Sequence, residues 1–149
     1  MRFWDTSAVV PLCLLEPETS RVRALAEADP ALVVWWGTRT ECVSAVVRRQ
    51  REGRLGPTVA ERARRALLAL AAEWSEVLPS ELVRNRTERL LGVHNLRAAD
   101  AFQLAAALLW SRGETSTRAV VSLDDRLREA AHREGFRVLP ERRAPSGSP

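Results

Sequence analysis

The sequence contains no lysine, no isoleucine and no tyrosine, and all 23 of its basic residues are arginine. These three residue types are encoded by AT-rich codons, so their absence is typical of a protein from a GC-rich genome. The absence of lysine also has chemical consequences. It excludes a Walker A phosphate loop, a Schiff-base lysine and the phosphate-binding lysine of receiver and haloacid-dehalogenase domains.

Cysteine and histidine are equally scarce. The two cysteines, Cys13 and Cys42, lie inside apolar runs, and we expect them to be buried free thiols. No CxxC or paired-histidine motif supports a zinc site. His94 and His132 have no partner at catalytic spacing, and Cys42 has no histidine arranged as its base. A cysteine–histidine hydrolase is therefore disfavoured.

Long apolar runs are also missing. No run reaches the roughly 18 residues that a membrane-spanning helix needs, and the stretch 8–15 is interrupted by Pro11 and lacks the cleavage site of a signal peptide. We therefore expect a cytoplasmic protein without a membrane association. The formal net charge of +4 is compatible with a polyanionic partner, because arginine binds phosphate in a bidentate manner, and equally with a solvated arginine-rich surface.

Short apolar stretches alternate with longer amphipathic ones along the chain. The short stretches predict strands at Arg2–Trp4, Ala31–Trp35, Glu76–Leu78, Ala119–Ser122 and Phe136–Leu139. The longer ones predict helices at Ser7–Leu15, Pro17–Ala28, Thr38–Gln50, Pro57–Trp74, Glu81–Leu91, Arg97–Trp110 and Asp124–Glu134. This alternation predicts an α/β fold with a parallel sheet. We expect one domain over residues 1–140 and a disordered tail at 141–149, which is rich in Arg, Pro, Ser and Gly.

Acidic residues follow the predicted strands or begin the predicted helices. They are Asp5, Glu41, Asp100 and the pair Asp124–Asp125, and four of the five aspartates in the chain are among them. Because the carboxyl ends of parallel strands share one edge, we expect these side chains to converge. Carboxylates about 4 Å apart repel by roughly 4 kcal/mol at an effective dielectric of 20, so a cation is needed, and oxygen ligands favour Mg²⁺ or Mn²⁺.

Each acid also has a purely structural explanation. Asp5, Asp124 and Asp125 could be helix caps, and Glu41 could be an exposed residue paired with arginine. Asp100 is harder to explain in this way, because it lies among Ala98, Ala99, Ala101 and Phe102. A carboxylate in such an apolar helix is costly unless it is paired or binds a metal.

Four segments resemble the PIN-domain family, and in particular VapC-type toxins of bacterial toxin–antitoxin pairs. They are Asp5-Thr6-Ser7-Ala8, Thr40-Glu41-Cys42-Val43-Ser44-Ala45, the stretch from Leu96 to Ala107 around Asp100, and Val121-Ser122-Leu123-Asp124. The resemblance covers residues 1–139. It implies a PIN-like three-layer α/β/α fold with a central parallel sheet of about five strands, and a Mg²⁺- or Mn²⁺-dependent endoribonuclease that leaves 5′-phosphate and 3′-hydroxyl ends.

The resemblance also implies a site and partners. Asp5, Glu41, Asp100 and Asp124 would form the acidic site that holds the metal. Asp5 and Asp100 are expected as direct ligands, with Glu41 and Asp124 completing the sphere and Ser7 as a supporting hydroxyl. Asp125 is an alternative to Asp124, although Ser122-Leu123-Asp124 keeps the family's spacing. The implied partners are an RNA substrate, a VapB-type antitoxin and a second copy of the chain in a homodimer.

Cationic and aromatic residues add two further hypotheses. Arg97, Arg126 and Arg39 lie close in sequence to the acids, so they could contact RNA phosphates or simply pair with those acids. Among the five tryptophans, Trp4, Trp35 and Trp74 fit core positions better than base-stacking ones.

Three other functions are compatible with the same acids. One is a PIN-type RNA-processing nuclease that has no antitoxin. The second is a non-catalytic domain that binds Mg²⁺ through its acidic pocket for signalling, although the missing lysine argues against a receiver. The third is an inactive PIN domain that only binds RNA or antitoxin.

Overall fold

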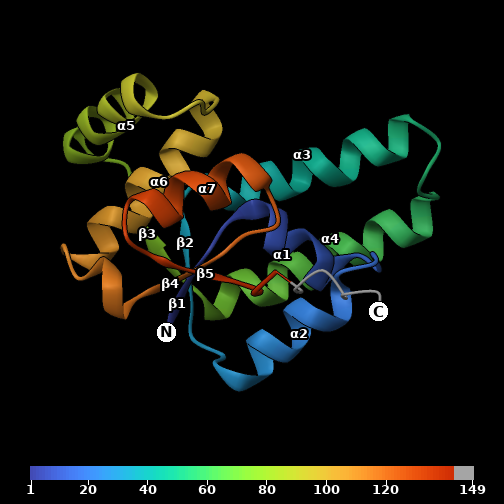
Figure 1. Cartoon of the computed structure of the whole chain (residues 1–149). Helices are drawn as coiled ribbons and strands as arrows, with labels where there is room; N and C mark the ends of the chain where they lie inside the picture. Colours follow the sequence, from blue (N-terminus) through green and yellow to red (C-terminus); the bar gives the residue numbers. More distant parts are fainter. Residues whose placement is uncertain (143–149) are drawn as a thin grey trace, which may run out of the picture.

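The computed structural model describes residues 1–142, in which five parallel strands form one sheet with helices on both faces (Figure 1). The strands are β1 (Arg2–Trp4), β2 (Leu32–Trp35), β3 (Ser75–Val77), β4 (Ala119–Val121) and β5 (Arg137–Leu139). Their order across the sheet is β3-β2-β1-β4-β5, and every pairing is parallel. The predicted α/β/α fold with a central parallel sheet is confirmed.

The central strands are apolar throughout because both faces of the sheet are covered. Side chains alternate between the two faces of a strand, and neighbours such as Phe3 and Trp4 therefore enter different hydrophobic cores. Trp4 and Val34 lie in one core, whereas Phe3 and Val33 lie in the other. All four side chains are buried, which explains why the strands show continuous apolar runs rather than alternation.

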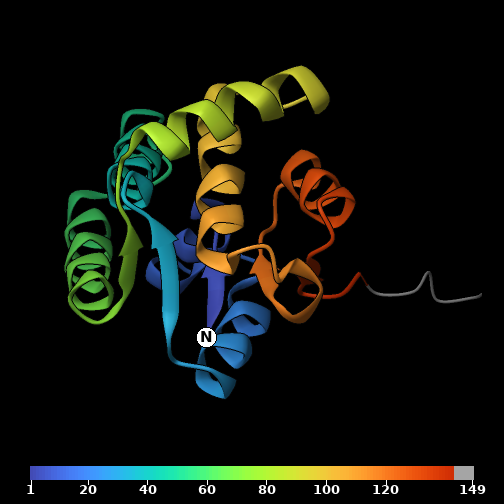
Figure 2. The ribbon, with the colours of Figure 1, turned by 90° about the vertical axis from the view of Figure 1, so that its left-hand side faces the viewer.

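Each core is closed by its own set of helices. The core around Trp4 is covered by α1 (Thr6–Cys13), α2 (Thr19–Ala28), α3 (Thr38–Arg51) and α4 (Pro57–Glu73). The core around Phe3 is covered by α5 (Glu81–Val93), α6 (Ala98–Ser111) and α7 (Asp125–Arg133), and a short 3₁₀ turn, η1 (Thr115–Thr117), precedes β4. Figure 1 shows α3 and α4 extending together to one side of the molecule, and Figure 2 shows α5 lying across one end of α6.

The strand order places a crevice at the carboxyl edge of the sheet. From β1 the chain moves outward to β2 and β3, and then returns to the other side of β1 to form β4 and β5. The connections therefore diverge between β1 and β4, and this is the position at which open α/β sheets bind ligands. The register pairs Trp4 with Val121, so Asp5 and Ser122 leave the two strands side by side.

Local details of two helices concern the predicted elements. Asp5 caps the start of α1, because its carboxylate accepts the Ser7 backbone N–H, so one of the structural explanations offered for this acid is confirmed. On α4 the buried residues are Ala60, Ala63 and Leu67, whereas Val59 is 44% exposed. The buried residues are three and four positions apart, so they share one face of the helix, and Val59 lies outside that face.

The predicted tail at 141–149 lies outside the described residues except for Glu141 and Arg142. These two form ion pairs with Arg137 and Asp125, respectively. Among residues 1–142 no helix is both long enough and apolar enough to cross a bilayer.

Candidate active site

A cavity of about 920 Å³ opens at the carboxyl edge of the sheet, and all four predicted acids line it. Asp5 follows β1, Glu41 lies on α3, Asp100 lies on α6 and Asp124 precedes α7. Four segments that are far apart in sequence therefore meet at the crevice where the strand connections diverge.

Asp5 is the most buried of these acids, with only 3% of its surface exposed. Its backbone N–H donates to the Val121 carbonyl at 2.9 Å, which continues the β1–β4 pairing. Its Oδ2 accepts hydrogen bonds from the Ser7 backbone N–H at 3.2 Å, from the Ser7 hydroxyl, and from the Ser122 hydroxyl at 3.0 Å. Burial raises the pKa of Asp5 to about 6 although these hydrogen bonds oppose it, and the nearby Asp100 adds to the rise.

Ser7 connects the two loops that carry Asp5 and Asp124. Its hydroxyl donates to Asp5 and accepts the backbone N–H groups of Leu123 at 2.8 Å and Asp124 at 3.2 Å. The predicted supporting hydroxyl thus contacts an acid of the site. Its role toward a metal stays a prediction.

Glu41 lies in the first turn of α3, as predicted, and its carboxylate accepts hydrogen bonds from two other helices. Thr6 Oγ1 donates to Glu41 Oε2 at 2.9 Å, and the amide nitrogen of Gln103 lies 3.3 and 3.4 Å from the two carboxylate oxygens. Burial raises the pKa of Glu41, these hydrogen bonds lower it, and the charge of Asp100 raises it further.

Asp100 lies in the first turn of α6, and its side chain is partly buried beside the cavity. Burial raises its pKa first, and the charge of Asp124 raises it further. Arg97 and Arg126 act in the opposite direction. The acids are therefore near enough to influence one another electrostatically, and arginines partly offset their charge.

Asp124 and Asp125 have different surroundings although both line the cavity. Asp124 caps α7 by accepting the Leu127 N–H at 2.9 Å, and it is the one whose charge raises the Asp100 pKa. The Asp125 side chain is 83% exposed and pairs with Arg142 at 2.8 Å. This difference favours Asp124 as the fourth acid of the site.

The acids line one cavity but do not enclose an ion. Within residues 1–142 no three acidic, histidine or cysteine side chains stand close enough together to form a metal cage. The donor set still fits a hard cation, because it consists of carboxylate and hydroxyl oxygens. Mg²⁺ in particular keeps several of its waters and commonly needs only one or two carboxylates. The residues therefore fit an open, hydrated metal site rather than a closed one.

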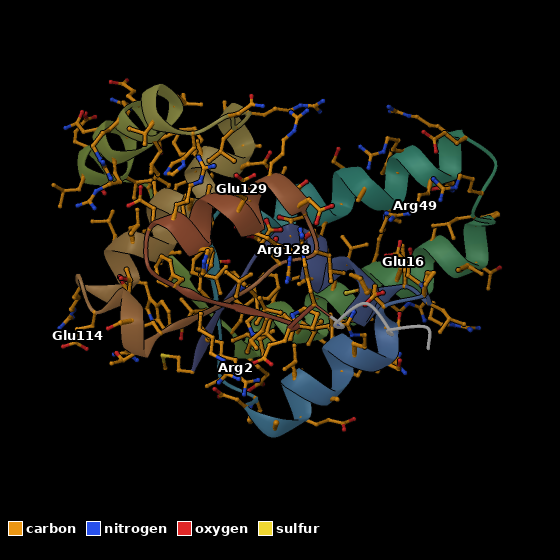
Figure 3. All side chains as sticks on the ribbon, viewed as in Figure 1. Arg2, Glu16, Arg49, Glu114, Arg128 and Glu129 are labelled. Atoms are coloured by element: carbon orange, nitrogen blue, oxygen red, sulfur yellow. The ribbon has the colours of Figure 1, made fainter. Side chains whose placement is uncertain are left out.

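Arginines line the same cavity as the four acids. Arg97 and Arg126 line the cavity as exposed side chains, and Arg48 does so from α3. Arg49 also lines it, but its guanidinium pairs with Glu16 of the α1–α2 connection (Figure 3). Arg39, the third predicted phosphate contact, is exposed and is not among the described residues that line the cavity.

The histidine and cysteine nearest in sequence to the acids are structural. His94 ends α5, is 9% exposed, and its Nε2 lies 2.8 Å from Glu134. Cys42 is buried and burial raises the pKa of its thiol; burial likewise raises that of Cys13 to about 11. Both are free thiols, as predicted, although Cys13 is only partly buried. A thiol with a raised pKa is a poor nucleophile near neutral pH.

Thr6 and Gln103 both contact Glu41, and neither residue was predicted to have a role in the site. A signal for Gln103 is present in the sequence, since it is a polar amide three residues after Asp100 in an otherwise apolar helix. Residues at this spacing share a helix face, so Gln103 lies on the same face of the helix as Asp100. Nothing in the sequence distinguishes Thr6 from an ordinary first-turn helix residue.

Comparison with known proteins gives structural matches only. No protein-family model matches the sequence, and no curated protein matches it significantly. Among solved structures, VapC20 of Mycobacterium tuberculosis, described as a sarcin–ricin loop cleaving toxin, has a TM-score of 0.63 and 18% identity, covering 87% of this chain and 95% of its own. FitAcB of Neisseria gonorrhoeae has a TM-score of 0.63 and 19% identity, covering 93% of this chain and 96% of its own.

A toxin–antitoxin complex from Klebsiella pneumoniae is also similar, with a TM-score of 0.56 and 19% identity over 83% of this chain and 87% of that one. At such identities the likeness concerns the fold. The chain therefore has the PIN-like α/β/α fold that the sequence predicts, in common with solved toxins.

Proposed function

We propose that this protein is a metal-dependent endoribonuclease and the toxin of a VapBC-type toxin–antitoxin pair. The observation that carries the proposal is the convergence of Asp5, Glu41, Asp100 and Asp124 on one cavity at the crevice of the sheet. The fold shared with VapC20, which is described as a sarcin–ricin loop cleaving toxin, supports the same conclusion.

The proposed cofactor is Mg²⁺ or Mn²⁺. When bound, such an ion would lower the pKa of a coordinated water and accept charge from the phosphate oxygens. Asp5 and Asp100 are proposed as direct ligands, while Glu41 and Asp124 complete the site or orient water. The pKa of Asp5 is raised by burial, and a cation nearby would offset this because it favours the ionised carboxylate.

The arginines around the cavity are proposed to bind the RNA backbone. The acidic residues that line the cavity repel a polyanion, so cationic groups must hold the RNA strand close to them. Arg48 on α3, Arg97 just before α6 and Arg126 on α7 are exposed and line the same cavity as the acids. Their positions support contacts to the phosphates of a bound RNA strand.

The first experiment measures cleavage of a labelled single-stranded RNA by the purified protein with MnCl₂ and with EDTA. We expect cleavage only with the metal, products that carry 5′-phosphates, and loss of activity in Asp5→Asn and Asp100→Asn. Glu61→Gln, which removes an exposed acid on α4, serves as the control. Wild-type cleavage rates in either aspartate variant would contradict the ligand assignment.

The second experiment separates a toxin from other nucleases. Induction of the wild-type gene should stop the growth of a bacterial host, and Asp5→Asn should relieve the effect. RNA cleavage in vitro without any effect on growth would instead support an RNA-processing nuclease. Absence of both activities would support a non-catalytic acidic-pocket domain.

An antitoxin and a homodimer are proposed as partners. Several large apolar side chains are exposed, including Leu82 and Val93 on α5 and Leu78 just before it. The solved toxin–antitoxin complex of similar fold supports a protein partner for this chain. Light scattering coupled to size-exclusion chromatography tests the homodimer, and co-expression with a small reading frame adjacent to the gene tests the antitoxin.

A further inference from the structure

Gln103 has a fully buried amide on a helix that is otherwise apolar in its interior. The side chain is 0% exposed, and Leu104, Ala105 and Ala106 beside it are also buried. Burial of an amide is costly unless its hydrogen bonds are made. The partners of this amide therefore indicate why a glutamine occupies the position.

Those partners belong to two other helices. The Nε2 of Gln103 lies 2.8 Å from Thr6 Oγ1 of α1 and 3.1 Å from Thr38 Oγ1 of α3. It also lies 3.3 and 3.4 Å from the two carboxylate oxygens of Glu41. One amide group thus connects three helices at a single carboxylate.

The direction of these hydrogen bonds is fixed by chemistry. The amide nitrogen has two hydrogens to donate and accepts none, so its four oxygen neighbours share two hydrogens, and the shortest contact is the one to Thr6 Oγ1. Thr6 Oγ1 accepts from it and donates its own hydrogen to Glu41 Oε2 at 2.9 Å. If the amide of Gln103 were rotated, its oxygen would face the Glu41 carboxylate and repel it. The Glu41 carboxylate therefore accepts hydrogen bonds from Thr6 and Gln103, and Glu41 also lines the cavity.

We infer that Gln103 is a positioning residue, which acts directly and through Thr6 to hold the Glu41 carboxylate toward the cavity. A glutamate side chain has several rotatable bonds, and ordering it costs conformational entropy. The buried amide and the threonine hydroxyl fix the orientation of Glu41 in the free protein. The entropy cost of ordering its side chain is therefore smaller when Glu41 contributes to the proposed metal site. The inference rests on the proposed function, since it assigns a purpose to the orientation of Glu41 in that site.

The experiment compares Gln103→Leu, which removes the donors at similar volume, with the matched pair Thr6→Val and Thr6→Ser. The serine variant keeps the hydroxyl and the valine variant removes it. We expect Gln103→Leu and Thr6→Val to weaken Mn²⁺ binding in calorimetry by roughly 10-fold or more, as for other groups that orient metal ligands. The kcat for RNA should fall, and KM should stay the same because the cavity arginines are untouched. Thr6→Ser should restore both values.

Equal Mn²⁺ affinity and kcat in Thr6→Val and Thr6→Ser would overturn the inference, even if Gln103→Leu failed to fold. Crystal structures of the metal-free Thr6 variants give a test that does not depend on activity. Glu41 should turn away from the cavity in Thr6→Val and keep its place in Thr6→Ser. An unchanged Glu41 in both would also overturn the inference. A wild type that neither binds Mn²⁺ nor cleaves RNA would instead overturn the proposed function, and the crystal structures would still decide whether the Thr6 hydroxyl, through which Gln103 acts, orients Glu41.

Discussion

Replacing Asp5 by asparagine should stabilise the metal-free protein at neutral pH. Asp5 is 3% exposed, and burial raises its pKa from 3.8 to about 6. Since one pKa unit is worth about 1.36 kcal/mol, ionisation of Asp5 costs the folded state roughly 3 kcal/mol at neutral pH. Asparagine keeps an oxygen that can accept from Ser7 and Ser122 and carries no charge. We expect a gain of roughly 1–3 kcal/mol, because the new amide hydrogens also need acceptors.

The pH dependence of this gain has a definite sign. The Asp5 pKa is higher in the folded state than in the unfolded state, so the folded protein binds more protons between about pH 4 and pH 6. Stability must then fall as the pH rises through that window. Asp5→Asn removes this contribution, so the difference between the variant and the wild type should be smallest near pH 4 and largest above pH 6. Asp100 interacts with Asp5, so the titration belongs partly to the pair.

The assay is urea unfolding of both proteins with EDTA at several pH values between 4 and 8. Asp29→Asn is the control with the opposite sign. The pKa of Asp29 is lowered by its hydrogen bond from the N-terminal ammonium, so its replacement should destabilise the protein at neutral pH. If Asp5→Asn were less stable than the wild type at pH 7.5, with a difference that did not change with pH, the reasoning would be refuted.

Three further pairs of substitutions test the fold. Gly37→Ala should lower the free energy of unfolding, measured in urea, by about 1–3 kcal/mol, because its Cβ would lie 2.6 Å from Trp35 Nε1. The matched Gly92→Ala on α5 adds a Cβ that meets nothing within 4 Å, and it should slightly stabilise the protein. Arg128→Leu should cost roughly 3 kcal/mol in thermal unfolding, because the guanidinium donates to the carbonyls of Ser122, Leu139 and Pro140. Arg133→Leu, which loses only an exposed pair with Glu129, should cost less than about 1 kcal/mol. Leu67→Ala should cost about 2–5 kcal/mol and Leu68→Ala less than about 0.5 kcal/mol, since Leu67 is 1% exposed and Leu68 is 52% exposed.

The elements of the fold were predictable because local sequence carries their signals. The helix predicted at Arg97–Trp110 is observed at Ala98–Ser111, and the strand predicted at Ala31–Trp35 is observed at Leu32–Trp35. Apolar runs that are buried on both faces, and polar residues at helix starts, are properties of neighbouring residues. The parallel direction of the strands also follows from general rules for alternating strands and helices, and parallel strands share one carboxyl edge, so the four acids were predicted to lie at that edge. The order of the strands, in contrast, is known only from the structure.

The distinction between Asp124 and Asp125 could not be made in the same way. Both are aspartates at the start of the same helix, and no neighbouring residue indicates in which direction each side chain points. They differ only in three dimensions. Asp124 binds the Leu127 N–H and affects Asp100, whereas Asp125 turns toward Arg142. Because that difference depends on the direction of each side chain relative to the sheet, spacing alone could only favour one of them.

The hydrogen bonds from Thr6 and Gln103 to Glu41 were harder to predict from the sequence. An acid at a strand end is conspicuous by itself, whereas Thr6 and Gln103 matter only through one another and are 97 residues apart. A lone glutamine in an apolar helix is ambiguous, since it could bind a backbone carbonyl or a water. Its purpose becomes defined only when the packing of α6 against the sheet places its amide at 2.8 Å from a hydroxyl of α1. Acids at the ends of strands can thus be predicted from their position in the sequence, whereas the residues that contact those acids are set by the packing of one element against another.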